Sequence, residues 1–185
     1  MGKGFSLLSC PHHIGVVVPD LSTAMDAYIS TLGVSFSVFD LDETNSAFSG
    51  SSDSFRLRIG FGSLGVSAVE LIQPVSGETI HARFLAEKGP GIHHLGFWVG
   101  DLSKARTQLE ALGYRSLMEG AIRDLGRFAY YEAPELHCII EPLEFAIGFP
   151  LFLARHASVY SRNKPLEDAS ERAIRDFMGH RAEQT

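Results

Sequence analysis

Residues 12–20, HHIGVVVPD, and residues 93–101, HHLGFWVGD, decide how this 185-residue chain is interpreted, because they are two copies of one pattern. When the copies are extended to residues 12–24 and 93–105, eight of 13 positions are identical. Each copy then continues to a Leu-Gly pair, at 32–33 and at 112–113. A repeat of this length predicts two related structural modules.

Each copy predicts a buried strand followed by a helix. IGVVV and LGFWV are short runs of β-branched and aromatic residues, which favour strands. Asp20 and Asp101 stand where helix caps are expected, and apolar residues then recur at helical spacing up to Gly33 and Gly113. Three further strands are predicted in each half, at residues 35–40, 55–61 and 66–73, and at residues 114–119, 127–132 and 137–143.

The order βαβββ in both halves predicts an α+β fold. One such module buries too little apolar surface by itself, so the two sheets are expected to pair into an incomplete barrel around a shared cavity. The expected domain spans residues 1–144, with a first module (11–75), a linker helix (76–91) and a second module (92–144). The polar, Gly/Ser-rich stretch 42–54 within the first module is predicted to be a loop.

Residues 145–185 lie outside the repeat and are predicted to form a helical extension. Residues 145–157 are strongly apolar, and residues 165–178 have the pattern of an amphipathic helix. An apolar tail of this kind is expected to cover the core or a neighbouring subunit of a homodimer.

The composition excludes several classes of protein. The net charge of −6 repels phosphate backbones, so nucleic acid is not an expected partner. No apolar run approaches the roughly 20 residues of a membrane-spanning helix, and we see no secretory signal at the start. Cys10 and Cys138 form no CxxC pair, which favours a reducing cytoplasm. A small-molecule substrate is therefore the expected partner.

Strand alternation selects one histidine from each pair. If His13 points into the shared interior, Gly15 and Val17 do too, which leaves the apolar residues between them for the helix. The second copy places His94, Gly96 and Trp98 inward by the same rule. The glycines leave room beside each imidazole.

The last strand of each module contains a carboxylate among apolar residues, Glu70 in AVELI and Glu141 in IIEPL. A buried carboxylate is costly unless it is paired or binds a metal. The set His13, Glu70, His94 and Glu141 therefore predicts a site for one divalent ion such as Zn, Ni, Co, Fe or Mn. The competing interpretations are a solvent-contacting histidine at a strand start and, because Pro142 follows it, a Glu141 on an exposed edge strand.

Further residues are assigned more coarsely. His12 and His93 are expected to contact only the ligands, and His81, His137, His156 and His180 are interpreted as ordinary histidines. Arginines on strands commonly face solvent, but Arg56, Arg58 and Arg127 are candidates for binding a substrate carboxylate or phosphate. Trp98 and Tyr130 are expected in the wall of the cavity, as further candidates for substrate contact.

The motifs HHIG, VELIQP, GIHHLGFWV and IIE together resemble the vicinal oxygen chelate superfamily over about residues 11–144. Within it, they are most similar to the branch of glyoxalase I and methylmalonyl-CoA epimerase. The resemblance implies that His13, Glu70, His94 and Glu141 bind the metal. It also implies proton transfer next to a carbonyl through a metal-chelated enediolate, with Glu70 or Glu141 as the base.

One departure from the epimerases concerns the base. Those enzymes have an acid on the middle strand of the first module, where this chain has FRLRIGFG, with Arg56 and Arg58. Glu132 is a further candidate base. The predicted function is a metal-dependent isomerase, epimerase or lyase. The alternatives are an Fe(II)-dependent dioxygenase of the same fold and a non-catalytic binding protein of the antibiotic-resistance kind.

Overall fold

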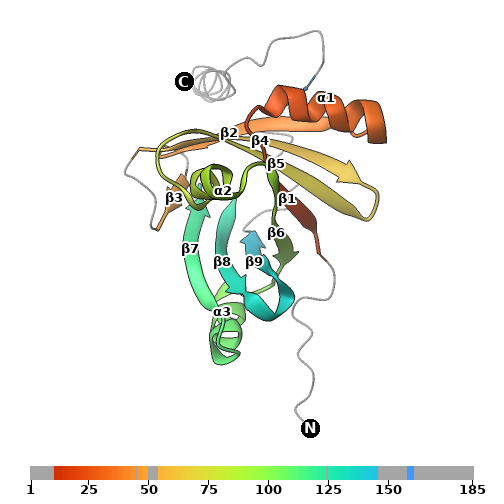
Figure 1. Cartoon of the computed structure of the whole chain (residues 1–185). Coiled ribbons are helices and arrows are strands. Elements are labelled where there is room, and N and C mark those ends of the chain that lie inside the picture. Colours follow the sequence, from red (N-terminus) through yellow and green to blue (C-terminus); the bar gives the residue numbers. More distant parts are fainter. Residues whose placement is uncertain (1–10, 45, 50–53, 124, 146–157, 161–185) are drawn as a thin grey trace, which may run out of the picture.

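The computed structural model describes residues 11–44, 46–49, 54–123, 125–145 and 158–160 (Figure 1). The first module contains β1 (His13–Val17), α1 (Leu21–Leu32), β2 (Phe36–Asp42), β3 (Ser46–Phe48), β4 (Arg56–Leu64) and β5 (Ser67–Ser76). The linker is α2 (Ile80–Lys88). The second module contains β6 (Gly91–Trp98), α3 (Leu102–Ala111), β7 (Arg115–Ile122), β8 (Gly126–Ala133), a short 3-10 helix (Pro134–Leu136) and β9 (Cys138–Phe145). The predicted order βαβββ is confirmed in both halves, with one added strand.

The described residues form a single ten-stranded sheet with the order β10-β2-β4-β5-β1-β6-β9-β8-β7-β3. The first strand of each module lies at the centre, where β1 and β6 pair antiparallel. Each of them also pairs in parallel with the last strand of its own module, β1 with β5 and β6 with β9. Figure 1 shows α1 beside the half of the sheet formed by β2, β4 and β5, and α3 beside the other half. This is the predicted α+β arrangement of two modules in an incomplete barrel.

The stretch predicted to be a loop contains a strand. β3 follows β2 closely and pairs antiparallel with β7, with Ala47 opposite Ala121. The Ser46 hydroxyl donates to the carbonyl of Asp42 at 2.7 Å, which fixes the turn between β2 and β3. The first module therefore contributes a strand to the far edge of the second, and the chain links the two ends of the curved sheet.

Side-chain hydrogen bonds fix where α1 and α3 begin. The carboxylates of Asp20 and Asp101 accept from backbone amides one turn into each helix, as predicted for N-caps. The first amide of α1 also donates to Gln73 Oε1 at 3.0 Å, and the first amide of α3 to Glu144 Oε2 at 2.6 Å. Gln73 and Glu144 stand three residues after Glu70 and Glu141, so each helix is tied to the strand that carries a predicted ligand.

The two faces of β1 and β6 divide the core as the alternation predicts. Val16 and Val18 pack against Leu21 and Met25 of α1, whereas Val17 belongs to the interior cluster. In the second module, Phe97 and Val99 pack against α3. The interior face is therefore left to the histidines, the glycines and a set of large apolar side chains.

Little of the extension lies within the described residues. Residues 158–159 form β10, which pairs antiparallel with β2, and the Tyr160 amide donates to the carbonyl of Phe36 at 2.9 Å. The predicted helix 165–178 and residues 146–157 fall outside the described part of the chain. Among the described helices, none combines the length and hydrophobicity needed to cross a membrane.

Candidate metal centre

His13 and His94 come together because β1 and β6 pair at the centre of the sheet. In this register His13 lies opposite Gly96, and His94 lies opposite Gly15. A Cβ added to Gly15 would overlap the ring of His94, and a Cβ added to Gly96 would overlap the ring of His13. Each glycine therefore makes room for the imidazole of the other module, a reciprocal arrangement that the sequence suggested only as space beside each ring.

The same register brings in the two carboxylates. Glu70 on β5 lies opposite Gly15, and Glu141 on β9 lies opposite Gly96. Both glutamates thus point over a glycine toward the imidazoles. The competing interpretation of Glu141 as an edge residue facing water is wrong, since β9 lies between β6 and β8 and the Glu141 side chain is only 4% exposed.

Four atoms converge at one point between the modules. The Nε2 atoms of His13 and His94 lie 3.1 Å apart. Glu141 Oε2 lies 3.1 Å from His13 Nε2 and 3.3 Å from His94 Nε2, and Glu70 Oε2 lies 3.4 Å and 3.3 Å from the same two atoms. Ligands about 2.0–2.2 Å from a tetrahedral ion are themselves separated by roughly 3.3–3.6 Å. These separations and the mixed N/O donor set therefore fit a divalent ion.

The carboxylate oxygens lack hydrogen bonds, and this also supports a metal site. Within the described chain, Glu70 Oε2 and Glu141 Oε2 are buried and accept no well-directed hydrogen bond. Buried carboxylate oxygens without such a donor are costly, because desolvation is not compensated. An ion at the point where the four atoms converge would compensate for the desolvation of both oxygens.

Proton affinities in the cluster reflect the same crowding of charge. Burial lowers the pKa of His13, but the adjacent carboxylates of Glu141 and Glu70 outweigh it and raise that pKa to about 10. Burial raises the pKa of Glu70 and of Glu141, and the two imidazoles outweigh it, so that both carboxyl pKa values lie below their usual range. A divalent cation would take the place of protons on these imidazoles, because ligands bind a metal in their deprotonated form.

The first histidine of each pair supports the second. His12 Nδ1 lies 3.2 Å from His13 Nδ1, and His93 Nδ1 lies 3.0 Å from His94 Nδ1. Such a contact at Nδ1 orients a ligating imidazole with Nε2 toward the ion. His12 and His93 therefore contact the ligands, as expected from the sequence.

A cavity opens beside the four convergent atoms. The cavity is narrow, and only about 40 Å³ of it is open to the centre of a water-sized sphere. Polar groups at its wall include His13, Glu70, His81, Tyr130 and Glu141. The remaining wall is largely aromatic and aliphatic, formed by residues such as Phe39, Leu41, Phe48, Leu57, Ile59, Phe61, Phe128 and Leu143. This lining suits a small ligand with oxygen atoms at one end and an apolar remainder.

Of the predicted substrate residues, some line the cavity and others do not. Tyr130 lines the cavity; its burial and the charges of Glu141 and Glu70 raise the pKa of its phenol well above the usual value. Arg127 also lines the cavity and forms an ion pair with Glu144 at 3.0 Å. Trp98 is outside the residues that line it: its ring stacks on His12 with centroids 3.9 Å apart, and it is 47% exposed.

Two predicted substrate residues and one candidate base lie elsewhere. Arg56 and Arg58 are on the opposite face of β4 from the cavity, where both bind the buried carboxylate of Asp40. Strand alternation explains this, because their neighbours Leu57 and Ile59 occupy the cavity face. Glu132 is a surface residue paired with Arg115, so the suggestion that it acts as base is wrong.

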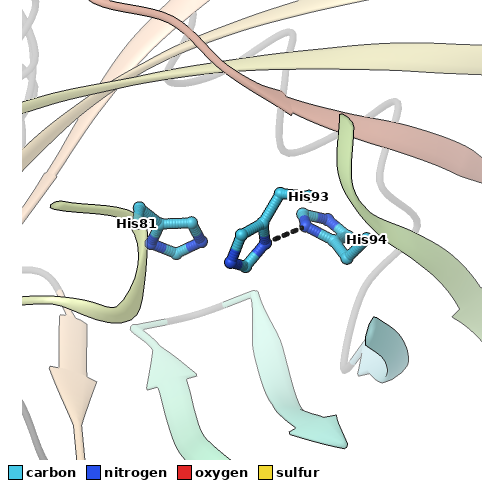
Figure 2. Close-up of side chains that lie close together, drawn as sticks. All are labelled: His81, His93 and His94. Carbon is cyan, nitrogen blue, oxygen red and sulfur yellow. Dashed lines mark hydrogen bonds between the residues drawn. The ribbon is translucent and has the colours of Figure 1, made fainter. Parts of the chain in front are cut away.

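His81, interpreted from the sequence as an ordinary histidine, is buried at the cavity wall. Figure 2 shows His81 beside His93, with His94 on the other side of His93. His81 is 2% exposed, its ring centroid lies 4.8 Å from that of His93, and the residue lines the cavity. The sequence offered one signal, a histidine at the start of an otherwise amphipathic linker helix. Of the other histidines interpreted as ordinary, His137 is exposed, and His156 and His180 lie outside the described residues.

The chain is similar to proteins of known family. Residues 12–131 match the family model described as the Glyoxalase/Bleomycin resistance protein/Dioxygenase superfamily. The ethylmalonyl-CoA/methylmalonyl-CoA epimerase of Cereibacter sphaeroides is 32% identical over 111 residues, covering 59% of this chain and 75% of that protein. The uncharacterized protein YqjC of Bacillus subtilis is 30% identical over 100 residues, which are 54% of this chain and 62% of that protein.

The fold is shared with solved structures. The crystal structure of methylmalonyl-CoA epimerase from Mycobacterium tuberculosis aligns with a TM-score of 0.53 at 21% identity, covering 78% of this chain and 93% of that one. At this identity the likeness concerns the fold alone.

Proposed function

Because the chain belongs to the Glyoxalase/Bleomycin resistance protein/Dioxygenase superfamily, we propose that it is a metal-dependent isomerase, epimerase or lyase that moves a proton on the carbon next to a carbonyl group. The observation that carries the proposal is the convergence of His13, Glu70, His94 and Glu141 on one point beside a cavity. These four residues would hold one divalent ion.

An ion bound there would supply Lewis-acid stabilisation for charge that develops on a substrate oxygen. The protein's own part is to place the substrate and accept the proton. Glu70 is the more accessible of the two carboxylates, with a side chain 16% exposed against 4% for Glu141. Glu70 is therefore our choice for the proton acceptor, since a base must reach the substrate carbon.

The cavity wall restricts the substrate. Leu57, Ile59 and Phe61 occupy the face of β4 that looks into the cavity, so this middle strand offers no carboxylate base. Apolar walls exclude water and strengthen the electrostatic interactions at the centre. The epimerase among the relatives acts, by its name, on ethylmalonyl-CoA and methylmalonyl-CoA. We propose that this chain acts on an acyl thioester or a related small carbonyl compound of the same kind.

Two measurements on the purified protein test the proposal. Elemental analysis of protein that has not been exposed to chelator should find one divalent ion per chain. Incubation with methylmalonyl-CoA or ethylmalonyl-CoA in D₂O should add one deuterium next to the carbonyl, and chelation should stop the exchange. The substitution Glu70→Gln removes the proposed proton acceptor and should stop the exchange. Glu132→Gln, a substitution on the surface, is its matched control and should leave the exchange intact.

The alternatives give different results. A dioxygenase would consume oxygen only with ferrous iron, and a binding protein of the resistance kind would bind ligand without exchange. Protein that holds no metal although the four donor residues are intact contradicts the proposal.

A further inference from the structure

His81 is a buried polar side chain that is not one of the four proposed metal ligands. It stands in the first turn of α2, whose cap Thr79 accepts from the amide of Ala82 at 3.1 Å. The helix holds the ring against the rings of His93 and Tyr130, with centroids 4.8 and 5.4 Å away. The residue is therefore fixed in place at the wall of the cavity (Figure 2).

Both ring nitrogens of His81 lack a hydrogen-bond partner. Within the described residues, Nδ1 and Nε2 are fully buried and neither forms a hydrogen bond. A neutral imidazole carries one N–H and one lone pair, so two polar atoms remain unsatisfied. Such groups are rare in folded proteins, because each costs the free energy of its lost hydration. A ligand in the cavity that completes these bonds would account for the histidine.

The charge state of the ring suits a neutral hydrogen-bonding role. His81 is only 2% exposed, and burial favours the neutral form of an imidazole. A second metal ion shared by His81, His93 and His94 is a weaker explanation. His94 already faces the first centre through Nε2 and contacts His93 Nδ1 through its own Nδ1, and three neutral imidazoles would leave a buried dication without counter-charge.

We propose that His81 binds the substrate directly, by a hydrogen bond to an oxygen atom other than those at the centre formed by His13, Glu70, His94 and Glu141. This inference rests on the proposed function and narrows its substrate class. The substrate would be a carbonyl compound that carries a further carboxylate or hydroxyl group. A malonyl-type thioester has such an oxygen: with the carbonyl and one carboxylate oxygen at the centre, the second carboxylate oxygen remains for His81.

The experiment compares His81→Phe, which removes both polar atoms, with His81→Gln, which retains a donor and an acceptor. Arg83→Gln, on the exposed face of the same helix, is the control for effects on α2. The probe is methylmalonyl-CoA with the metal-loaded protein. Calorimetry gives the Kd, deuterium incorporation in D₂O gives exchange, and thermal unfolding is measured on metal-free protein.

We expect His81→Phe to weaken binding about 10- to 100-fold, the range for one lost hydrogen bond to a charged group. His81→Gln should recover most of this loss, and Arg83→Gln should match the wild type. The unfolding midpoint of metal-free His81→Phe should rise by a few degrees, roughly 2–4 °C, because the unsatisfied atoms are gone. A purely structural histidine predicts a lower midpoint.

The failures of the two proposals can be told apart. If the binding of methylmalonyl-CoA depends on His81 but no deuterium is incorporated, the proposed function is overturned and this inference is retained. Exchange with equal Kd values for wild type and His81→Phe overturns this inference alone. Wild-type protein that does not bind the probe overturns both. Two ions per wild-type chain and one per His81→Phe chain would establish the second metal site instead.

Discussion

A single methyl group at Gly96 should remove the metal centre. Gly96 lies on β6 opposite His13, and a Cβ there would overlap three atoms of the His13 ring, Cε1, Nε2 and Nδ1. The ring is almost fully buried, so it can relieve the overlap only by shifting. Ordinary contact distances of about 3.5–4.0 Å require a displacement of more than about 1 Å. Metal–ligand distances tolerate only about 0.2 Å, so Nε2 would leave the donor set.

The expected magnitudes follow from that displacement. Gly96→Ala should weaken the binding of Zn²⁺ by at least about 100-fold, beyond the 10- to 100-fold typical of losing an outer partner of a ligand. Overpacking a rigid core costs about 1–3 kcal/mol, which lowers the unfolding midpoint by roughly 3–10 °C in a chain of this size. Competitive titration with a Zn²⁺ indicator and thermal unfolding of metal-free protein measure the two effects.

Gly91 provides the matched control on the same strand. A Cβ at Gly91 meets no atom of the described residues within 4 Å. Gly91→Ala should therefore keep full metal affinity and be neutral or slightly stabilising, because alanine reduces the entropy of the unfolded chain. If Gly96→Ala bound Zn²⁺ as tightly as Gly91→Ala, the assignment of His13 as a ligand would be refuted.

Three further substitutions test other parts of the structure. His93→Leu should lower metal affinity about 10- to 100-fold, because His94 loses the contact that orients it; unchanged affinity in a metal titration contradicts that role. Glu70→Gln should abolish deuterium exchange while Glu132→Gln leaves it intact, and equal exchange rates in the two variants exclude Glu70 as base. Asp40→Asn should lower the free energy of unfolding in urea by about 1–3 kcal/mol, because Arg56 loses a carboxylate 2.6 Å away. The same variant should bind as much metal as the wild type. A loss of metal would show that this ion pair supports the centre.

The architecture and the four convergent residues were predictable because they depend on local patterns that occur twice. Strand alternation placed His13 and His94 on the inner face, and repeat-related positions supplied Glu70 and Glu141. The two-fold relation then required all four to meet. The structure adds the reciprocal role of Gly15, which depends on the antiparallel register of β1 against β6 and cannot be inferred from either copy alone.

The remaining features depend on contacts between distant segments. His81 sits on a helix, and its place at the cavity follows from how α2 docks against the sheet. β3 forms because residues 46–48 meet β7, more than 70 positions along the chain. For Arg56 the information was present but not applied, since alternation with Leu57 already places it away from the cavity. Tertiary partners, unlike periodicity, leave no regular signal in a single sequence.

The reciprocal glycines also limit how the two copies can diverge. A side chain gained at Gly15 would displace a histidine encoded 79 positions later, and one gained at Gly96 would displace His13. Neither copy can therefore drift at its glycine without disabling the other. Some positions that differ between the two strands, such as Val16 and Phe97, belong to the apolar clusters between the sheet and the helix of their own module. An ancient duplication would retain its His-x-Gly signature in both halves for this reason, long after neighbouring positions had changed.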